Sequence, residues 1–385
     1  MICVPIVGPT MERALADISK ASDIADIIEL RLDLIDDVDL SSLIKAADNP
    51  TIVTNRHKRE GGQFKGSEEE RIKLLQQAID AEVDYIDIEA GTSREFLQPI
   101  LETPSKTKKI LSYHHFSLTP DTVINFYETM SETPADIIKI VTYAKNISDN
   151  IIIFNLLRHA RESGKKLISF CMGDLGEISR ILTTLMGGFL TFGSLDTGKE
   201  SAPGQIPASI LKDIYRVKLE RGDYKIFGVI GDPVSKSLGY LIHNTAFKKK
   251  NLPHIYIPFL VHDVAKFFSD FEPYFAGLSV TMPHKEKIRR LLDMTDGVAD
   301  SIGSANTVVR ESNIWVGYNT DYSGAMKTFK DRCDLSGKKV LIIGSGGTAK
   351  AIGYGVVKEG GDLTVTYNQN KERGEALASD LNCRL

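Results

Sequence analysis

A lysine interrupts an otherwise apolar segment of the chain. The sequence Ile137-Ile138-Lys139-Ile140-Val141 predicts a parallel strand whose two faces are both buried. Desolvation of Lys139 would favour its neutral, nucleophilic amine, which can attack a carbonyl carbon. The alternative is a lysine paired with Glu89 or Glu29 for stability alone, and this alternative also places the side chain inside.

Ionisable side chains recur at the ends of five consecutive predicted strands. A charged group inside a strand is costly unless it is paired or functional. One such group would most simply form a salt bridge at the rim of the sheet, but five strands that share the pattern favour a functional site. The residues are Glu29 and Arg31, Arg56, Asp87 and Glu89, His114 and His115, and Lys139.

These strand ends meet on one rim if the parallel sheet is closed. Short β-branched runs alternate with amphipathic stretches, which predicts an α/β fold with an N-terminal (β/α)8 TIM barrel over residues 1–222. An open doubly wound sheet would use fewer strands. The expected strands are Ile2–Val7, Ile27–Asp33, Thr51–Arg56, Tyr85–Glu89, Lys109–His114, Ile137–Thr142, Leu167–Cys171 and Leu190–Ser194. The last expected helix, Ala208–Arg221, precedes a polar hinge at Gly222-Asp223-Tyr224-Lys225.

The whole chain has the composition of an ordinary globular protein. Its 385 residues include 47 Lys and Arg against 51 Asp and Glu, so no global basic field is available to hold nucleic acid. No apolar run is long enough to span a bilayer, and the N-terminus predicts a buried strand rather than a signal peptide. The four cysteines form no Cys-x-x-Cys pair, so we expect no metal site and no disulfide. Small-molecule partners in a reducing, cytoplasmic compartment fit best.

Several polar segments of the first module match one enzyme family. They resemble type I 3-dehydroquinate dehydratases in order and spacing, although Leu30 replaces an aromatic residue and His115 an aspartate of many members. The segments are Glu29–Asp33, Arg56–Gly62, Asp87–Glu89, Ser112–Phe116, Lys139, Met172-Gly173, Ser179-Arg180 and Ser201–Gln205.

This resemblance implies dehydration through a Schiff base, without a metal or cofactor. Lys139 would condense with the C3 ketone of 3-dehydroquinate, and Glu89 would orient and tune His114. His114 would remove the C2 proton and then protonate the leaving C1 hydroxyl. We expect this role for His114 rather than His115, because alternation sends the two side chains to opposite faces. Arg180 would be the bidentate partner of the substrate carboxylate. The other substrate contacts implied are Glu29, Arg31, Arg56, Met172, Ser201 and Gln205.

A second α/β pattern begins after the hinge. Its expected strands start at Ile226–Gly231 and continue with Ile255–Phe259, Gly277–Val280, Thr307–Arg310, Lys339–Ile343 and Leu363–Tyr367. The strand at Lys339–Ile343 runs into a glycine-rich turn and a helix of small residues, which is the context of a dinucleotide-binding loop. We therefore expect an α/β substrate domain over residues 226–330 and a partial Rossmann domain over residues 331–385.

The second module resembles shikimate dehydrogenases, and the two modules together resemble the fused enzymes of aromatic biosynthesis. The segments that carry the resemblance are Gly231–Asn244, Ser279–Glu286, Gly303–Thr307 and Gly317–Asp321. It implies that Lys285 and Asp321 handle the hydroxyl proton during hydride transfer, and that Ser237, Thr281, Asn306 and Asp321 contact the substrate. NADP is the implied cofactor. The residues expected to hold it are Gly344, Ser345, Gly346, Gly347, Thr348, Ala349, Asn368, Lys371 and Arg373.

The second module departs from this family at several positions. Gly239 replaces a serine that holds the substrate carboxylate. Asn368-Gln369-Asn370 lacks the arginine that grips an NADP 2′-phosphate; Lys371 or Arg373 could replace it, and NAD stays possible. The chain ends at Leu385, after two strands of the Rossmann half, so we expect weak shikimate oxidation or none.

The sequence thus predicts two consecutive steps of the shikimate pathway, from 3-dehydroquinate to 3-dehydroshikimate and then to shikimate. One alternative makes the second module a quinate dehydrogenase, because Gly239 leaves room for an extra C1 hydroxyl. Another makes it a non-catalytic ligand-binding domain beside an active barrel. The sequence predicts neither the oligomeric state nor channelling between the sites.

Overall fold

The computed structural model describes residues 1–218 and 224–385. The chain divides into two compact units. Unit 1 comprises Met1–Tyr224 and Asn244–Pro253, and unit 2 comprises Lys225–His243 and His254–Leu385. Gly222 and Asp223 of the predicted hinge, and residues 219–221 of the predicted helix 208–221, lie outside the described residues.

Unit 1 contains the predicted parallel barrel. Its strands pair in parallel in the order β7-β6-β5-β4-β3-β2-β1-β8. Between β7 and β8 the Phe189 N–H donates to Leu167 O at 2.7 Å. A two-residue strand, β9 (Ile206–Pro207), extends the sheet beside β8. The eight main strands are β1 (Ile2–Ile6), β2 (Ile27–Arg31), β3 (Thr51–Thr54), β4 (Tyr85–Glu89), β5 (Lys108–His114), β6 (Ile137–Tyr143), β7 (Lys166–Met172) and β8 (Thr191–Ser194).

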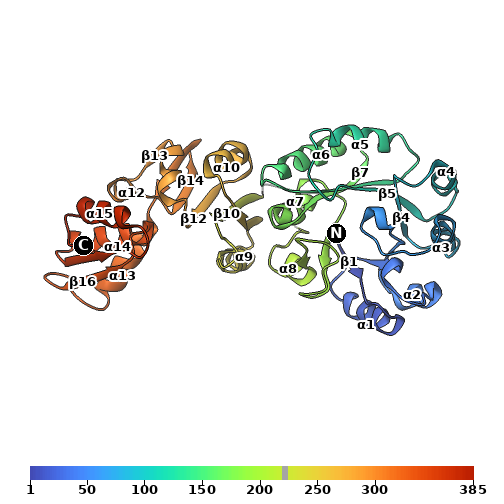
Figure 1. Ribbon diagram of the computed structural model, residues 1–385, viewed down its shortest axis with the longest axis horizontal. Coiled ribbons are helices and arrows are strands. Elements are labelled where there is room, and N and C mark those ends of the chain that lie inside the picture. Colours follow the sequence, from blue (N-terminus) through green and yellow to red (C-terminus); the bar gives the residue numbers. More distant parts are fainter. Residues whose placement is uncertain (219–223) are drawn as a thin grey trace. The chain divides into compact units, whose positions relative to one another are not determined.

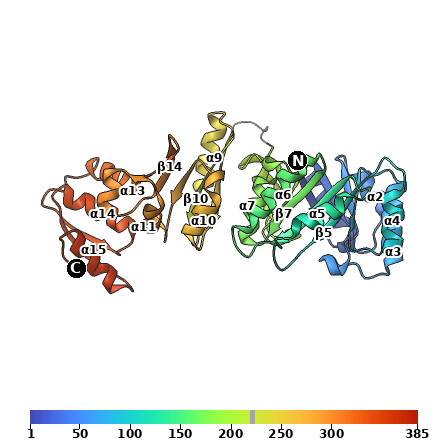
Figure 2. The same ribbon diagram turned by 90° about the horizontal axis from the view of Figure 1, so that it is seen from above.

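A helix follows each strand, and the helices lie outside the strands (Figures 1 and 2). They are α1 (Met11–Ala21), α2 (Leu40–Ala46), α3 (Glu68–Asp80), α4 (Arg94–Glu102), α5 (Val123–Ser131), α6 (Asp149–Ser163), α7 (Glu177–Met186) and α8 (Ala208–Asp213). Local sequence fixes several starts: Ser67 and Glu70, for example, form a capping box at α3. The prediction that the last helix reaches Arg221 is wrong, because α8 ends at Asp213 and Arg216 has a positive φ of 51°.

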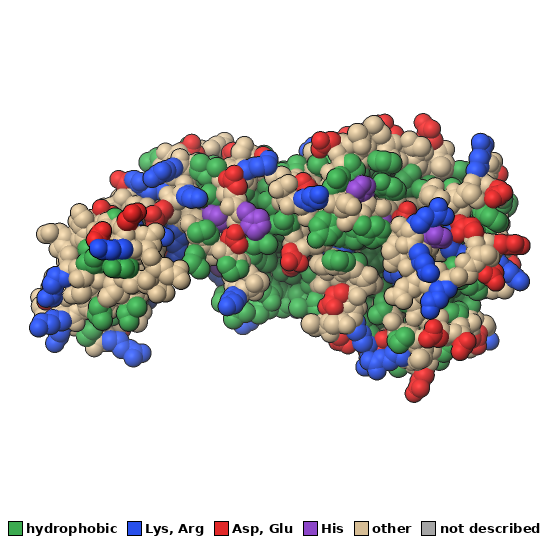
Figure 3. Space-filling view, in the orientation of Figure 1, with side chains coloured by type: hydrophobic (Ala, Val, Ile, Leu, Met, Phe, Trp, Pro, Cys, Tyr) green, Lys and Arg blue, Asp and Glu red, His purple; other side chains and the backbone are tan. Residues whose placement is uncertain are grey.

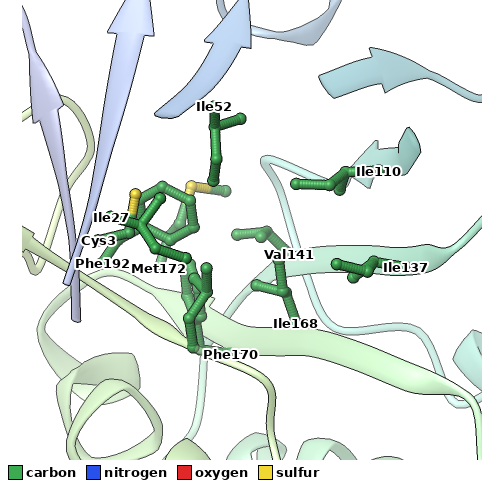
Figure 4. Close-up of a cluster of buried hydrophobic side chains, with 11 residues drawn as sticks. Cys3, Ile27, Ile52, Ile110, Ile137, Val141, Ile168, Phe170, Met172 and Phe192 are labelled. Carbon is green, nitrogen blue, oxygen red and sulfur yellow. The ribbon is translucent and has the colours of Figure 1, made fainter. Parts of the chain in front are cut away.

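Apolar side chains from the strands fill the barrel interior. They converge from strands on all sides of the barrel (Figure 4). The cluster consists of Cys3, Ile27, Ile52, Ile110, Ile137, Val141, Ile168, Phe170, Met172, Leu190 and Phe192. Val141, Phe170, Met172 and Phe192 of this cluster also line a cavity at the carboxyl ends of the strands, where barrels build their sites.

Two glycines let loops close over this end of the barrel. A Cβ on Gly62 would lie 1.9 Å from the backbone oxygen of Arg56, so only glycine allows the loop after β3 to fold back on the end of that strand. Gly204 has a φ of +73°, and a Cβ there would lie 2.6 Å from Gly173 O. The loop after β8 consequently packs against the end of β7.

Unit 2 contains a mixed sheet and the start of a second, parallel one. The mixed sheet has the order β11-β10-β12-β14-β15-β13, and β16 pairs with β17 in the other. β13 and β15 were not predicted; β15 forms a hairpin with β14 through Ser312 and Asn313, which both have positive φ. The strands are β10 (Lys225–Gly231), β11 (His254–Leu260), β12 (Gly277–Val280), β13 (Met294–Thr295), β14 (Thr307–Glu311), β15 (Ile314–Tyr318), β16 (Lys339–Ile343) and β17 (Asp362–Thr366).

The helices of unit 2 include four that place its polar residues. They are α11 (Lys285–Ile288), α13 (Thr320–Lys330), α14 (Gly347–Lys358) and α15 (Lys371–Asp380). The others are α10 (Val264–Phe271), α12 (Gly297–Ile302) and the first part of α9 (Gly239–Lys249), which belongs to unit 1 from Asn244 on. Two apolar side chains of β16 are largely exposed to solvent: Leu341 is 59% exposed and Ile343 is 85% exposed.

Two features of the structure concern membrane-spanning helices and the distribution of surface charge. Among the described residues, no helix combines the length and the apolar composition needed to cross a bilayer. On the face drawn in Figure 3, the basic and acidic side chains that can be seen are interspersed rather than gathered in a basic band.

We predict that Gly62→Ala destabilises unit 1 by about 1–3 kcal/mol, because its methyl group would collide with the Arg56 backbone. Gly91→Ala is the matched control, since the nearest atom to its Cβ is Glu60 Oε1 at 3.8 Å. Urea unfolding of both variants tests this expectation. Equal free energies of unfolding for the two variants would contradict it.

Candidate active sites

The carboxyl end of the barrel opens into a polar cavity with about 520 Å³ of space connected to solvent. Every residue predicted for this module lines the cavity except Glu89. The predicted residues that line it are Glu29, Arg31, Arg56, His114, Lys139, Met172, Arg180, Ser201 and Gln205. Glu60, Gly61, Phe116, Val141, Phe170, Phe192 and Ala202, which were not singled out, line it as well.

Asp87 joins the two buried cations at the bottom of this cavity. Its Oδ2 accepts from Lys139 Nζ at 2.8 Å and lies 2.7 Å from Arg56 Nη2. Burial alone would raise the pKa of Asp87, but the charges of Arg56 and Lys139 hold it far below its ordinary value. Lys139 also lies 4.5 Å from the centroid of the Phe192 ring. The lysine is therefore held in one place, as a nucleophile requires.

Glu60, not Glu89, is the partner of His114. Glu60 Oε2 lies 2.9 Å from His114 Nδ1 and also accepts from the His114 backbone N–H at 3.0 Å. The prediction that Glu89 orients His114 is wrong, because Glu89 bonds the His57 backbone N–H and pairs with Arg56 and Arg71. The Glu-Gly-Gly sequence at residues 60–62 was the available signal, since the glycines fold the loop back over the strand end.

Burial and nearby charges keep the His114 imidazole neutral. Desolvation and the positive charges of Arg56 and Lys139 lower its pKa well below the ordinary value. Burial raises the pKa of Glu60 to about 7, although Arg56 opposes that rise. A neutral imidazole that is held through Nδ1 leaves Nε2 free to accept a proton from a bound molecule.

His115 lies outside the cavity lining. Its Nδ1 accepts from the backbone N–H groups of Ser117 and Leu118 at 3.4 and 3.2 Å. The two adjacent histidines therefore face different surroundings, as the strand alternation predicts.

Arg180 provides an uncompensated cation at the cavity wall. It is 1% exposed, its Nη2 donates to Pro203 O at 3.1 Å, and its Nε has no partner among the described residues. Burial lowers its pKa to about 10. Within the described chain, none of the ion pairs involves Arg180, whereas Arg31 is held by both oxygens of Asp33 at 2.9 and 2.8 Å. Arg180 is therefore the guanidinium that is best placed to receive an anion.

The loop after β8 presents polar groups beside Arg180. Gln205 Oε1 accepts from the Ser201 backbone N–H at 2.7 Å and lies 3.3 Å from Ser201 Oγ. Because the Gln205 side-chain oxygen is used in these two contacts, its amide nitrogen is the atom that can donate to a bound molecule. Hydroxyl and amide groups at this position can hold the hydroxyls of a polyol.

A second polar cluster lies within unit 2. Lys285 Nζ donates to Asp321 Oδ2 at 2.5 Å and to Thr348 Oγ1 at 2.9 Å. Asn306 Nδ2 donates to Asp321 Oδ1 at 2.8 Å, while Asn306 Oδ1 accepts from the Thr320 N–H at 2.8 Å. The predicted pair, Lys285 at the start of α11 and Asp321 in the first turn of α13, thus lies beside the first turn of α14.

The space at Gly239 is filled by a tyrosine. A Cβ there would lie 3.2 Å from Tyr256 Cε1 and 3.3 Å from both the Tyr256 hydroxyl and Ser237 Oγ. The predicted Ser237 accepts the Gly239 N–H at 3.3 Å, and the predicted Thr281 follows directly after β12. The room expected for an additional substrate hydroxyl at Gly239 is therefore limited by Tyr256.

The glycine loop fits a pyrophosphate. Gly344 to Ala349 connect β16 to the first turn of α14, and no side chain caps that turn. Nothing lies within 4 Å of a Cβ on Gly344 or Gly346, whereas a Cβ on Gly347 would lie 3.1 Å from Lys285 Cδ. Backbone N–H groups at an open helix N-terminus are suited to bind phosphate oxygens.

The cations expected at a 2′-phosphate are already paired with carboxylates. Arg373 bonds Glu286, and Lys371 Nζ lies 3.5 Å from Glu375 Oε1. Asn368 is exposed just after β17. A 2′-phosphate at this strand end would therefore compete with Glu286 for Arg373.

Comparisons with known proteins match both units. The type I 3-dehydroquinase model matches residues 2–221, and the model of the shikimate dehydrogenase substrate-binding domain matches residues 229–308. The chain is 37% identical to the chloroplastic bifunctional 3-dehydroquinate dehydratase/shikimate dehydrogenase of Arabidopsis thaliana, covering 98% of this chain and 66% of that relative. It is 34% identical to the shikimate biosynthesis protein AroDE of Chlamydia pneumoniae, covering 98% and 78%.

Two further comparisons concern the fold and the cofactor. The dehydroquinate dehydratase and shikimate dehydrogenase part of S. pombe AroM superposes with a TM-score of 0.51 at 27% identity, covering 98% of this chain and 76% of that one. A shikimate dehydrogenase (NADP(+)) of Syntrophobacter fumaroxidans is 39% identical, covering 41% of this chain and 56% of that relative.

We predict that Glu60→Gln stabilises the protein at pH 8 by about 1–3 kcal/mol. The pKa of Glu60 rises from an ordinary 4.5 to about 7 on folding, so the folded state keeps a proton that the unfolded chain has released. The stability that this group contributes is present below pH 4.5 and is lost as the pH rises through 7, and glutamine removes that loss. Urea unfolding at pH 4.5 and pH 8 measures the difference. A variant that is destabilised equally at both pH values would contradict the raised pKa.

Proposed function

Because the chain belongs to the family of bifunctional 3-dehydroquinate dehydratase/shikimate dehydrogenases, and its unit 1 to the type I 3-dehydroquinases, we propose that unit 1 dehydrates 3-dehydroquinate to 3-dehydroshikimate. The observation that carries this proposal is the buried lysine beside a neutral, carboxylate-held histidine in one cavity. Lys139 forms the Schiff base and His114 moves the protons.

The reaction begins when the Lys139 amine attacks the C3 carbonyl carbon. A carbinolamine forms and loses water, which leaves a protonated imine between Nζ and C3. Lys139 releases a proton to solvent in the open cavity before the attack, and the carbinolamine hydroxyl takes a proton back from solvent when it leaves as water. Asp87 is a poor acceptor for the proton that Lys139 releases, because Arg56 contacts the same Oδ2 and stabilises the ionised form of Asp87.

His114 then carries one proton from carbon to oxygen. Its Nε2 takes the C2 proton, and the electron pair of that bond moves toward the iminium nitrogen to give an enamine. The pair returns to form the C1–C2 double bond as the C1–O bond breaks, and His114 protonates the leaving hydroxyl to give water. Hydrolysis of the imine releases the product and the lysine. Glu60 stabilises the imidazolium between the two transfers.

Arg180 holds the substrate carboxylate at the cavity wall. A buried guanidinium without an ion-pair partner gains most from a bidentate carboxylate. Ser201 and Gln205 approach the ring hydroxyls from the loop after β8. Small molecules are therefore the partners of this site. The cytoplasmic location and the absence of nucleic-acid partners stay predictions from the sequence.

Unit 2 is proposed to reduce 3-dehydroshikimate to shikimate with NADP. When bound, the nicotinamide supplies the hydride. Lys285 and Asp321 hold and move the proton at the reacting oxygen, and Asn306 fixes the Asp321 carboxylate. Gly344 and Gly346 leave the backbone before α14 open for the pyrophosphate, and Gly347 lies against the Lys285 side chain.

Quinate oxidation is the second candidate for unit 2. It rests on the serine that is missing at Gly239, but the Tyr256 hydroxyl and ring lie where a side chain would be. We therefore favour shikimate over quinate as the substrate. A purely ligand-binding role does not require the short Lys285–Asp321 contact, whereas proton transfer at the reacting oxygen does.

We predict that sodium borohydride and 3-dehydroquinate together inactivate the protein and add the ligand mass to a peptide that contains Lys139. Lys139→Ala should abolish the label and lower turnover by several orders of magnitude. Lys109→Met is the matched control: Lys109 is a buried strand lysine, but its Nζ is bonded to Thr103 O and Ser105 Oγ at 2.8 Å, and it does not line the cavity. Peptide mass spectrometry locates the label, and a label on any other lysine refutes the mechanism.

We predict that Lys285→Ala and Asp321→Asn each lower NADPH-dependent reduction of 3-dehydroshikimate by about 10²-fold or more, because each removes a proton-handling group. Lys287→Ala, an exposed change in the same short helix, should leave the rate within about twofold. Absorbance at the nicotinamide band gives the rates. Variant rates equal to that of the unaltered chain would contradict these roles and favour the ligand-binding alternative.

A further inference from the structure

Arg71 has the most completely bonded side chain of the network behind the barrel site, yet it does not line the cavity. It lies on α3 and is 1% exposed. Nε and Nη2 donate to Glu68 at 2.9 and 2.8 Å, and Nη2 also donates to Thr92 Oγ1 at 2.8 Å. Nη1 donates to Glu89 Oε2 and, at 3.2 Å, to Asn55 O. All five N–H groups of the guanidinium are thus used.

These contacts join the ends of two neighbouring strands. Asn55 is the residue after β3, and its backbone oxygen lies directly before Arg56. Glu89 ends β4, and Thr92 is in the turn that follows. One rigid guanidinium on an outer helix therefore fixes the exits of both strands relative to each other.

Glu89 passes this constraint on to the catalytic groups. Its Oε1 accepts the His57 backbone N–H at 2.9 Å and lies 3.4 Å from Arg56 Nη1. His57 begins the loop that carries Glu60 to His114, and Arg56 holds Asp87 beside Lys139. Without Arg71, Glu89 keeps one cation instead of two and is free to rotate away from the loop.

We infer that Arg71 is a positioning residue of the dehydratase reaction, acting through Glu89 on Arg56 and on the loop that presents Glu60. The inference rests on the proposed dehydratase function. It differs from a purely structural role because it predicts altered chemistry in molecules that are fully folded.

Loss of Arg71 should lower kcat more than it changes KM. The groups that line the cavity stay in place, but their relative positions loosen, and a misplacement near 1 Å can cost about 10²-fold in rate. The titratable and charged groups that surround Glu60 are His114 on β5, Arg56 after β3, and Asp87 and Glu89 on β4. The Glu89 charge raises the pKa of Glu60, so a Glu89 that has lost one of its cations should raise it further. The acid limb of the pH profile should then move to higher pH.

The experiment compares the unaltered chain with Arg71→Met, Arg71→Lys and Arg94→Met. Arg94 is the matched control, because it is an exposed helical arginine whose Nε donates to Gln98 at 3.1 Å. Borohydride trapping with excess 3-dehydroquinate counts the competent sites in each sample, and kcat is expressed per trapped site. Circular dichroism melting reports the folded fraction.

The inference requires a 10- to 100-fold lower kcat per trapped site and a shifted acid limb for Arg71→Met. It requires partial recovery in Arg71→Lys, which keeps a cation beside Glu89, and no change in Arg94→Met. If Arg71→Met does not fold, a reduced kcat per trapped site in Arg71→Lys decides. Unchanged kcat per trapped site with a lowered melting temperature overturns the inference and leaves the dehydratase function standing. An unaltered chain that neither turns over nor traps 3-dehydroquinate overturns both.

Discussion

The carboxylate of Asp87 lies between two buried cations, and the barrel site depends on that arrangement. Lys139 and Arg56, both almost fully buried, approach the same Oδ2 at 2.8 and 2.7 Å. A buried charge without a partner costs several kcal/mol, and Asp87 offsets that cost for both cations. The pairs continue outward through Glu89 to Arg71 and Glu68, with charges that alternate in sign. The first member of this series of charges is Lys139, the proposed nucleophile, and the last is Glu68, near the surface.

The same charges determine the state of the histidine. Two cations near His114 and its burial disfavour the imidazolium, so the ring enters the reaction as a base. In this arrangement the ionised form of Glu60 is destabilised. No cation in the described part of the chain is directly bonded to Glu60, and burial raises its pKa to about 7. Active sites that transfer protons commonly contain a group whose charged form is less stable than it would be in water. The scaffold tolerates this because the dry core beneath is large and well packed.

Much of this site could be predicted from strand periodicity, because the carboxyl ends of parallel strands must meet at one rim. Lys139 and His114 lie where the alternation places them, and the separate surroundings of His114 and His115 follow from it. Arg180 lies on α7 and could be assigned only through the family resemblance. The partner of His114 could not be found that way. The family resemblance had assigned this role to Glu89, which ends β4, the strand next to β5. Glu60 reaches the ring through a loop that only Gly61 and Gly62 allow to fold back, and such loop geometry has no periodic signature.

Other differences have similar causes. The hairpin of β14 and β15 depends on two residues with positive φ, Ser312 and Asn313, which no hydrophobic pattern marks. Arg71 has the sequence context of an ordinary surface helix, since its importance arises from side chains that are distant in the sequence. In unit 2, the pairing of Arg373 with Glu286 depends on how a Rossmann helix packs near α11. Tertiary contacts of this kind can be reasoned about only once the fold is known.

The most direct test of the account is the protonation state of His114, measured by ¹⁵N NMR of the imidazole in the whole chain. The account requires a neutral ring from pH 6 to 9, with its proton on Nδ1 toward Glu60 and a bare Nε2 directed at the cavity. An imidazolium at pH 6 to 7, or a proton on Nε2 with Nδ1 bare, would contradict it.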